Sequence, residues 1–199
     1  METLEMQNEV KQEYEKMLVL PQQPRRKQFI LCPVGLIGAG KTTVTKPLAE
    51  KLMLVRISGD EIRKKLKEHG LSYDGLVRIA AELSKKYLAE GYSIALDSDA
   101  MSPRSKVVIE NAEQEFGAMP VWIHINPPEE FILNKLRTFK HTWLFKDADE
   151  AIANYMRRKN LHENLKGIPF VYTFDTSRDD LEHQINEAIL LIEQFVALP

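Results

Sequence analysis

Short apolar runs alternate with longer amphipathic stretches along most of this chain. Each apolar run has the length of a buried strand, and the amphipathic stretches repeat their apolar residues every three or four positions, as one face of a helix requires. Strands are therefore predicted over residues 29–34, 54–57, 93–97, 121–125 and 170–174. Helices are predicted over residues 3–18, 41–52, 60–68, 76–91, 102–116 and 181–195, with a further helix beginning near residue 126.

The predicted strands are apolar runs rather than alternating patterns and are separated by helices, which is typical of a parallel sheet covered on both faces. An α/β fold is therefore expected. Residues 1–26 are expected to form a helix and a linker, because Pro21 and Pro24 end the helical pattern, and residues 27–199 form the main domain. Ligands bind such sheets beyond the carboxyl ends of the strands, so the residues after each strand are the functional candidates.

Composition indicates the domain number and the cell compartment of this protein, but it does not identify the reaction. The 199 residues suit one compact domain, and 44% hydrophobic with 28% charged residues is ordinary for a soluble globular protein. A net charge of −2 does not favour a general nucleic-acid or anionic-membrane surface. The single cysteine, Cys32, predicts a buried thiol and a reducing compartment. Without a bilayer-spanning apolar stretch or a leader pattern, a cytoplasmic protein with no membrane contact is expected.

The most specific motif follows the first strand. Residues 35–42 read Gly-Leu-Ile-Gly-Ala-Gly-Lys-Thr, an unbroken G-x-x-x-x-G-K-[ST] sequence between a predicted strand and a predicted helix. Glycines let backbone N–H groups face phosphate oxygens, and the following helix adds its positive end. The lysine can neutralise phosphate charge during catalysis, and the threonine hydroxyl can bind Mg²⁺. ATP and Mg²⁺ are the expected ligands, with binding residues Gly35, Gly38, Ala39, Gly40, Lys41, Thr42 and Thr43.

An acidic residue follows the second strand, at the start of the next helix. Asp60 can accept the proton of an attacking hydroxyl, or hold that hydroxyl in line with the γ-phosphate. The alternative is an acidic residue that only stabilises the helix N-terminus. Arg63 lies on the same helix face, where it could contact an anionic acceptor. Asp60 is thus a candidate for catalysis, and both residues are candidates for acceptor binding.

The third strand also ends in carboxylates. Asp97 closes a buried strand beside the phosphate loop, a position that suits contact with Mg²⁺ or with its water. Thr42 and Asp97 are therefore the expected metal contacts. Asp99 is a candidate for acceptor binding. The alternative interpretation is that its carboxylate only stabilises a turn. The five histidines show no spacing typical of another metal site.

Basic residues gather between the fourth and fifth strands. In kinases with such a phosphate loop, the corresponding segment is a helical lid whose arginine crosses the phosphates and stabilises transition-state charge, and the same is expected here for about residues 137–165. Arg137 is the first candidate for that catalytic arginine, because it ends the helix after the fourth strand. Arg157 and Arg158 are alternatives that point about 100° apart on a helix, so one of the two is expected to face the site. A solvated helix face is the competing interpretation for each arginine.

These motifs together resemble the P-loop kinases that include polynucleotide 5′-kinase, zeta toxins and chloramphenicol phosphotransferase. The resemblance rests on the phosphate loop, Asp60-x-x-Arg63, the strand that ends at Asp97, Ser102-Pro103-Arg104, and Asp175-Thr176-Ser177. The loop and the Asp-x-x-Arg segment are also similar to those of adenylylsulfate kinase. The resemblance implies a three-layer P-loop NTPase fold with a five-stranded parallel sheet of order 2-3-1-4-5. It also implies that Asp60 is the general base, Arg63 an acceptor contact and a lid arginine a phosphate contact.

One segment departs from that group. Its members often carry Asp-Ala-Thr-Asn after the third strand, whereas this chain has Asp-Ser-Asp-Ala at residues 97–100. The additional carboxylate of Asp99 would disfavour a highly anionic acceptor placed directly beside it.

The leading hypothesis is a kinase that transfers the γ-phosphate of ATP to a hydroxyl of a small-molecule or nucleotide-type acceptor. A zeta-toxin-like nucleotide-sugar kinase and a polynucleotide 5′-kinase are alternatives, and the near-neutral charge makes a nucleic-acid partner possible but not favoured. A regulatory ATP-binding protein without turnover is a third hypothesis. The Asn-Lys-x-Asp motif of guanine recognition is missing from the sequence, which argues against a GTPase switch.

Overall fold

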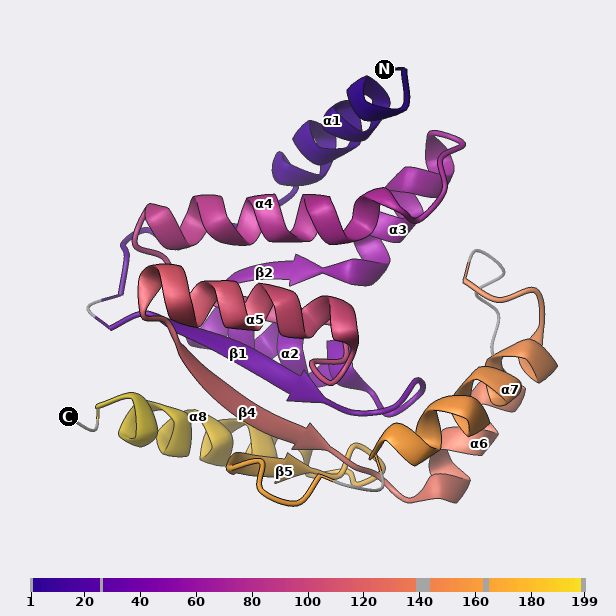
Figure 1. Cartoon of the computed structure of the whole chain (residues 1–199). Coiled ribbons are helices and arrows are strands. Elements are labelled where there is room, and N and C mark those ends of the chain that lie inside the picture. The colour runs from indigo at the N-terminus through magenta and orange to yellow at the C-terminus, as the bar shows by residue number, and fades with distance from the viewer. Residues whose placement is uncertain (1, 26, 139–143, 163–164, 198–199) are drawn as a thin grey trace.

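Five parallel strands form the sheet at the centre of the molecule (Figure 1). The computed structural model describes residues 2–25, 27–138, 144–162 and 165–197. The strands are β1 Phe29–Val34, β2 Val55–Ser58, β3 Ile94–Asp97, β4 Met119–Ile125 and β5 Phe170–Phe174. Their order is β2-β3-β1-β4-β5, and each pairing is parallel. The predicted α/β class and the strand order implied by the resemblance are confirmed.

Helices cover both faces of the sheet, which explains why the strands are mostly apolar (Figure 1). One face carries α1 Glu2–Glu15, α3 Gly59–Glu68, α4 Gly75–Ala89 and α5 Pro103–Phe116. The other face carries α2 Lys41–Lys51 and α8 Leu181–Ala197. Beyond the carboxyl ends of the strands lie α6 Glu129–Arg137, α7 Ala148–Lys159 and a 3-10 turn, Asn160–His162. None of the described helices is long and apolar enough to cross a lipid bilayer.

The sheet divides the hydrophobic core into two layers, because neighbouring residues of a strand point to opposite faces. In β1, Ile30 and Cys32 face the layer with α4 and α5, whereas Phe29 and Leu31 face the layer with α2 and α8. All four side chains are fully buried. The predicted burial of the Cys32 thiol is confirmed, and this burial raises the pKa of the thiol well above its usual range.

Local signals in the sequence set the start of helix α5. The Ser102 hydroxyl accepts a hydrogen bond from the backbone N–H of Ser105, and Pro103 takes the first helical position, as their order predicts. The Ser105 hydroxyl also lies 3.2 Å from the hydroxyl of Ser98, which follows β3. The start of α5 is thereby joined to the carboxyl end of the sheet.

The amino-terminal helix α1 contributes to the core. Val10 and Tyr14 are fully buried in the layer lined by α3 and α4. Met6 and Met17, which lie within the helix predicted over residues 3–18, are 36% and 56% exposed. The helix is buried only over its middle because it ends at Glu15 and its first turn extends beyond α4 (Figure 1).

A buried hydrogen bond connects α1 to the loop-facing end of the sheet. The backbone N–H of Ser58 donates to the Tyr14 hydroxyl over 2.7 Å. Ser58 is the last residue of β2 and also the N-cap of α3, whose first turn contains Asp60. The amino-terminal helix therefore supports the turn that positions a candidate catalytic residue.

Replacing Tyr14 with phenylalanine should destabilise the protein. The Tyr14→Phe variant keeps the ring but leaves the buried N–H of Ser58 without a partner, which costs about 1–3 kcal/mol of the free energy of unfolding. Urea denaturation followed by circular dichroism measures the difference. Tyr172→Phe is the matched control, because the Tyr172 hydroxyl donates to Glu187 in an exposed bond, and its loss should cost about 0.5 kcal/mol or less. Equal losses in the two variants would contradict this account.

Candidate functional site

The phosphate loop has the backbone conformation of an anion cradle. Gly40, the N-cap of α2, has a φ of 92°, a conformation that residues with a side chain rarely adopt. Gly35 lies so close to β4 that an added Cβ would be 2.8 Å from the carbonyl oxygen of Ile125. Gly38 and the buried Ala39 lie between them. The N–H groups at the start of α2 therefore remain open toward a ligand in the loop.

The Lys41 ammonium group lies against this loop. Its Nζ donates to the carbonyl oxygens of Gly35 over 2.9 Å and Leu36 over 3.0 Å. Burial lowers the pKa of the amine, and the negative charges of three aspartates oppose that effect. These aspartates, in decreasing order of influence, are Asp99, Asp60 and Asp97. The carboxylates at the ends of β2 and β3 thus all act on one ammonium group.

Asp97 joins the phosphate loop to the second strand. Its Oδ1 accepts a 3.0 Å hydrogen bond from the hydroxyl of Thr42, the residue with which it was predicted to share a metal. Its Oδ2 pairs with the guanidinium of Arg56, which also pairs with Glu61. Burial raises the pKa of Asp97, while Arg56 and Thr42 oppose the rise by stabilising the carboxylate. Thr43, next along α2, is exposed.

The register of the parallel strands brings Asp60 to the same edge of the sheet. Ser58 of β2 pairs with Asp97 of β3, so the residues just beyond these two strands are neighbours. Asp60 lies in the first turn of α3 with a half-exposed side chain. Its carboxylate forms an ion pair with Arg63, so the two residues expected on one helix face are in direct contact.

Asp99 faces the lid. Its Oδ2 lies 3.1 Å from Nε2 of His162 and 3.9 Å from the guanidinium of Arg158. The side chains of His162 and Asp99 are only 8% and 12% exposed. Burial alone would raise the pKa of Asp99, but the hydrogen bond with His162 and the charge of Lys41 lower it. The lid therefore meets the main domain at a carboxylate that also acts on the phosphate-loop lysine.

The three candidate lid arginines have different surroundings. Helix α7 and the 3-10 turn fall within the span predicted for the lid, whereas residues 139–143 and 163–164 of that span lie outside the described residues. Arg137 is exposed and donates over 2.6 Å to the side chain of Asn134 on its own helix. Arg157 is exposed on α7. Arg158 is the candidate that contacts a carboxylate of the site, through Asp99.

The loop after β5 supports the phosphate loop from the other side. The Thr176 hydroxyl donates to the carbonyl oxygen of Ala39 over 2.7 Å, and its side chain lies against Gly40. Asp175 accepts hydrogen bonds from the N–H and hydroxyl of Ser177, which fix the turn. The Asp-Thr-Ser segment that contributed to the family resemblance thus braces the backbone of the phosphate loop.

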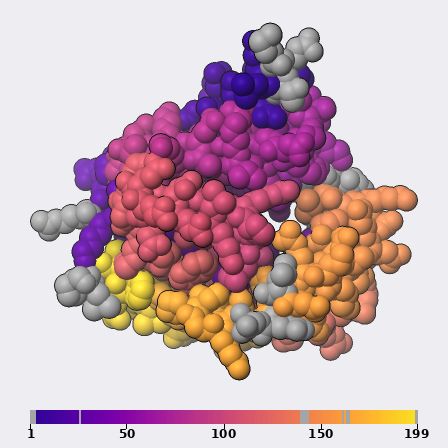
Figure 2. Space-filling view, in the orientation of Figure 1, coloured from indigo at the N-terminus to yellow at the C-terminus, as the bar shows by residue number. Residues whose placement is uncertain are grey.

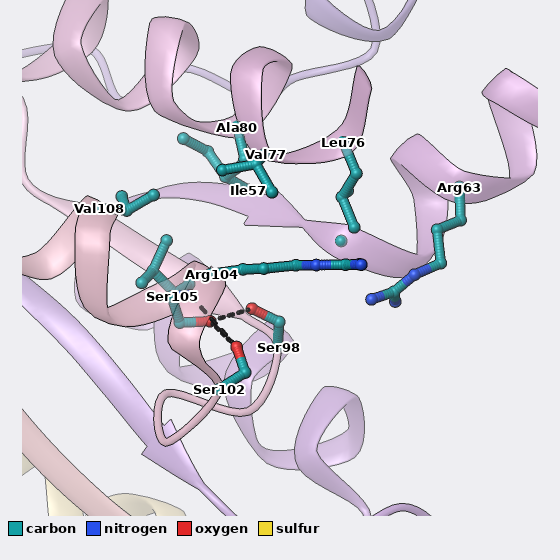
Figure 3. Close-up of a pocket in the computed structure, with 12 residues that line it drawn as sticks. Ile57, Arg63, Leu76, Val77, Ala80, Ser98, Ser102, Arg104, Ser105 and Val108 are labelled. Atoms are coloured by element: carbon teal, nitrogen blue, oxygen red, sulfur yellow. Dashed lines mark hydrogen bonds between the residues drawn. The ribbon is translucent and has the colours of Figure 1, made fainter. Parts of the chain in front are cut away.

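A pocket opens next to Asp60, between α4, α5 and the start of α3 (Figure 3). It encloses about 450 Å³, including space open to solvent. Hydrogen-bonded serine hydroxyls line one side and apolar side chains of α4 the other. Arg63 and Arg104 both reach into it. The molecular surface is also hollowed between the rose-coloured α5 and the orange α7 (Figure 2).

Four residues of this site have surroundings that the sequence did not predict, namely Arg56, Arg104, His162 and Thr176. Arg56 carried a usable signal, since a charge within an apolar strand needs a buried partner. His162 carried none, because its partner Asp99 is 63 positions away in the sequence. Arg104 and Thr176 were part of the family resemblance, but their contacts depend on how α5 and the last strand pack.

A known protein family matches the part of the chain that contains this site. The sequence profile of the family described as an AAA domain matches residues 30–159, which include the phosphate loop, Asp60, Asp97 and Arg158. No curated protein matches the chain.

Several solved structures share the fold. The PezAT toxin–antitoxin system of Streptococcus pneumoniae has a chain that is 12% identical, with a TM-score of 0.59 and 98% of each chain covered. The Mycobacterium tuberculosis APS kinase CysC, in complex with AMPPNP and APS, is 16% identical with a TM-score of 0.56, covering 86% of this chain and 99% of that chain. Shikimate kinase from Acinetobacter baumannii is 14% identical with a TM-score of 0.52, covering 86% of this chain and 96% of that chain. At these identities the likeness shows a P-loop kinase-like fold.

Replacing Arg56 should destabilise the protein in a pH-dependent way. The Arg56→Met variant leaves the carboxylate of Asp97 buried and unpaired, which costs about 3–5 kcal/mol of the free energy of unfolding near neutral pH. Because burial raises the folded-state pKa of Asp97, the protonated carboxyl is favoured in the fold, and stability is lost as pH rises through that pKa. Urea titrations near pH 4.5 and near pH 7 should therefore give a smaller loss at the lower pH.

The matched control removes a guanidinium from an exposed ion pair. Arg178 pairs with Asp180 at the surface, with 61% of its side chain exposed. Arg178→Met should cost less than about 1 kcal/mol at both pH values, because exposed ion pairs contribute little. A loss in Arg56→Met that is as small as the control, or equal at the two pH values, would refute the assignment of Arg56 as the partner of a buried carboxylate.

Proposed function

This chain belongs to the AAA domain family, and on that premise we propose that it is an ATP-dependent phosphotransferase. It transfers the γ-phosphoryl group of ATP to a hydroxyl of a small-molecule or nucleotide-type acceptor. The observation that carries the proposal is that Lys41, Asp97 and Asp60 share one edge of the sheet: Lys41 lies on the phosphate loop, Asp97 bonds to the adjacent Thr42, and Asp60 follows the strand that pairs with Asp97. Phosphoryl transfer needs a cation at the phosphate, a carboxylate near the metal and an acceptor for the hydroxyl proton. These three residues supply them.

The phosphate loop suits the triphosphate of ATP. Its backbone approaches β4 at Gly35 too closely for a side chain, and the start of α2 turns its N–H groups toward the loop. The carbonyl oxygens of Gly35 and Leu36 hold the Lys41 ammonium at the same place. Phosphate oxygens would replace these carbonyls as partners of the ammonium, with a stronger charge-assisted contact.

Thr42 and Asp97 suit a Mg²⁺ ion beside those phosphates. Their side-chain oxygens are 3.0 Å apart at the start of α2. Mg²⁺ typically takes one or two protein ligands and completes its shell with water and phosphate oxygens. The described part of the chain contains no group of three or more His, Cys, Asp or Glu side chains arranged for a metal, which agrees with a site of few protein ligands. When bound, Mg²⁺ would neutralise charge on the phosphates.

Asp60 is the proposed general base. The acceptor hydroxyl oxygen forms a bond to the γ-phosphorus, the bond from that phosphorus to the β,γ-bridging oxygen breaks, and ADP leaves. The hydroxyl proton passes to the carboxylate of Asp60. The half-exposed side chain of Asp60 supports this role, whereas Asp97 is buried and engaged by Arg56 and Thr42. Lys41 neutralises charge on the phosphoryl oxygens as the transfer proceeds.

Arg158 is the proposed lid arginine. It approaches Asp99, whose charge acts on Lys41, so it is near the position where phosphate oxygens are expected. Its side chain is 45% exposed, and its 3.9 Å separation from Asp99 is long for an ion pair. Phosphate oxygens can therefore compete with Asp99 for the guanidinium. Arg137, the first candidate from sequence, is the alternative that experiment must separate.

Two variants test the proposed chemistry. Lys41→Ala should weaken binding of Mg·ATP and lower kcat/KM about 10²–10³-fold, because it removes a preorganised charge from the transition state. Asp60→Asn should preserve Mg·ATP affinity and lower kcat about 10²–10⁴-fold, because it removes only the proton acceptor. Calorimetry measures binding. Transfer from γ-labelled ATP to small alcohols, nucleotide sugars and oligonucleotide 5′ ends measures turnover.

Asp74→Asn is the matched control for these variants. Asp74 is exposed at the start of α4, where it bonds to Ser72, and its replacement should leave transfer unchanged. Chelation of Mg²⁺ should abolish transfer. Normal turnover by Asp60→Asn would defeat the general-base assignment. If the protein binds ATP but labels no acceptor, it is a regulatory nucleotide binder, and if it does not bind Mg·ATP the proposal fails as a whole.

A second comparison identifies the lid arginine. Arg158→Ala should lower kcat about 10²–10³-fold with little change in the affinity for Mg·ATP, because its contact forms with the transferred group. Arg137→Ala should leave kcat nearly unchanged, since its guanidinium is engaged by Asn134 on the same helix. Steady-state kinetics of transfer decide between them. The reverse pattern would return the role to Arg137.

A further inference from the structure

Resting on the proposed function, we propose that the phosphoryl acceptor is a small hydroxy compound with an anionic group, which Arg104 and Arg63 bind in the pocket between α3, α4 and α5. The acceptor is thereby defined by three features: a hydroxyl, a compact apolar body, and a carboxylate, sulfate or phosphate group. Arg104 is the residue that selects the anion.

Two guanidinium groups reach the pocket from different helices. Arg104 comes from the first turn of α5, and Figure 3 shows it extended across the pocket with its guanidinium directed toward that of Arg63 on α3. Arg63 is paired with Asp60. Arg104 has no ion pair or hydrogen-bond partner among the residues that the structure describes. Adjacent guanidiniums repel one another, so an anion bound between them would stabilise the arrangement.

The pocket lining is positively charged. Its twelve lining residues include two arginines and no aspartate or glutamate. Ser98, Ser102 and Ser105 add hydroxyl groups at the start of α5. Arginine donors match the geometry of planar or tetrahedral oxyanions in two-point contacts. The polar side of the pocket is therefore suited to one oxyanion.

The other side of the pocket is apolar. Figure 3 shows Leu76, Val77 and Ala80 of α4 facing the two arginines, with Ile57 and Val108 nearby. A space of about 450 Å³ is near the lower end of the range for small-molecule sites. A polynucleotide would need a basic groove that follows successive phosphates, whereas this is a single compact pocket. A small acceptor with an apolar body fits both the size and the lining.

The pocket extends to the proposed base through Gly59. A Cβ built at this glycine would be in van der Waals contact with Cβ of Ser98 at 3.5 Å and with the guanidinium of Arg63 at 3.7 Å, so Gly59 lies between these two residues of the pocket wall. The next residue is Asp60, which contacts Arg63. A compound whose anion lies between Arg104 and Arg63 can therefore present its hydroxyl to Asp60.

Asp99 does not oppose this assignment. The sequence suggested that its carboxylate would disfavour a highly anionic acceptor placed directly beside it, but Asp99 is not among the residues that line the pocket. Its carboxylate faces His162 and Arg158 of the lid, and its charge acts on Lys41. The acidic residue thus belongs to the nucleotide side of the site, and the acceptor side carries the two arginines.

A titration of the full chain with sodium sulfate tests the anion site. Amide NMR signals of Ser102, Arg104 and Ser105 report on the pocket, and those of residues 38–40 report separately on the phosphate loop. Sulfate should shift the pocket amides saturably, while sodium chloride at equal ionic strength should not. Arg104→Gln should weaken sulfate at these amides about tenfold or more, because it removes a two-point charge-assisted contact. Arg104 has no partner among the described residues, so this variant should fold.

Lys106→Gln is the matched control. It removes the same charge from the same helix, but Lys106 does not line the pocket, so sulfate affinity should be unchanged. A hydroxy acid and its methyl ester, such as 4-hydroxyphenylacetate and methyl 4-hydroxyphenylacetate, test the class of acceptor. The acid should shift the pocket amides at lower concentration than the ester, and Arg104→Gln should remove the difference.

The outcomes separate this inference from the proposed function. If Mg·ATP shifts the loop amides but neither sulfate nor the acid shifts the pocket amides, the anionic-acceptor proposal is overturned and the kinase proposal stands. Equal binding of acid and ester, or equal weakening by Lys106→Gln and Arg104→Gln, also overturns it. If sulfate binds in an Arg104-dependent manner but Mg·ATP does not affect the loop, the anion site stands and the kinase proposal fails.

Discussion

The charge balance around the Lys41 ammonium is the interaction on which the rest of the site depends. A buried amine tends to lose its proton, and here the charges of Asp99, Asp60 and Asp97 oppose that tendency. The three carboxylates repel one another, and the positive charge of the ammonium offsets part of that repulsion. Arg56 supplies a second cation behind Asp97. The carboxyl edge of the sheet thus carries charges of both signs, and the buried Asp97 depends on Arg56 as its ion-pair partner.

Each of the three aspartates connects this centre to a different part of the molecule. Asp97 is tied to α2 through Thr42 and is the most buried of the three. Asp99 faces the lid, which carries His162 and Arg158. Asp60 opens toward the arginine-lined pocket. Asp97 and Asp99 thus lie on a nucleotide side of the site and Asp60 on an acceptor side, as transfer between two substrates requires. This arrangement follows from the order of strands β2, β3 and β1.

Much of the architecture could be predicted from sequence because its signals are local. Apolar runs bounded by glycine, proline and charged residues defined the strands, and the Ser102-Pro103 pair defined the start of α5. The phosphate loop was readable for the same reason, since its glycines, lysine and threonine are consecutive. The strand order came from a family resemblance, and the observed sheet confirms it. The burial of α1 could not be predicted in the same way, because which turns of a helix are buried depends on what packs against it.

By itself, the sequence determined the α/β class, the position of each strand and the phosphate-binding motif, because backbone preferences and apolar spacing act over a few residues. Only the tertiary structure decided which distant side chains meet. The contact of Asp99 with His162, the pairing of Arg56 with Asp97, and the reach of Arg104 toward Arg63 each join separate elements. Such contacts are set by strand register and helix packing, and no local pattern in the chain encodes them.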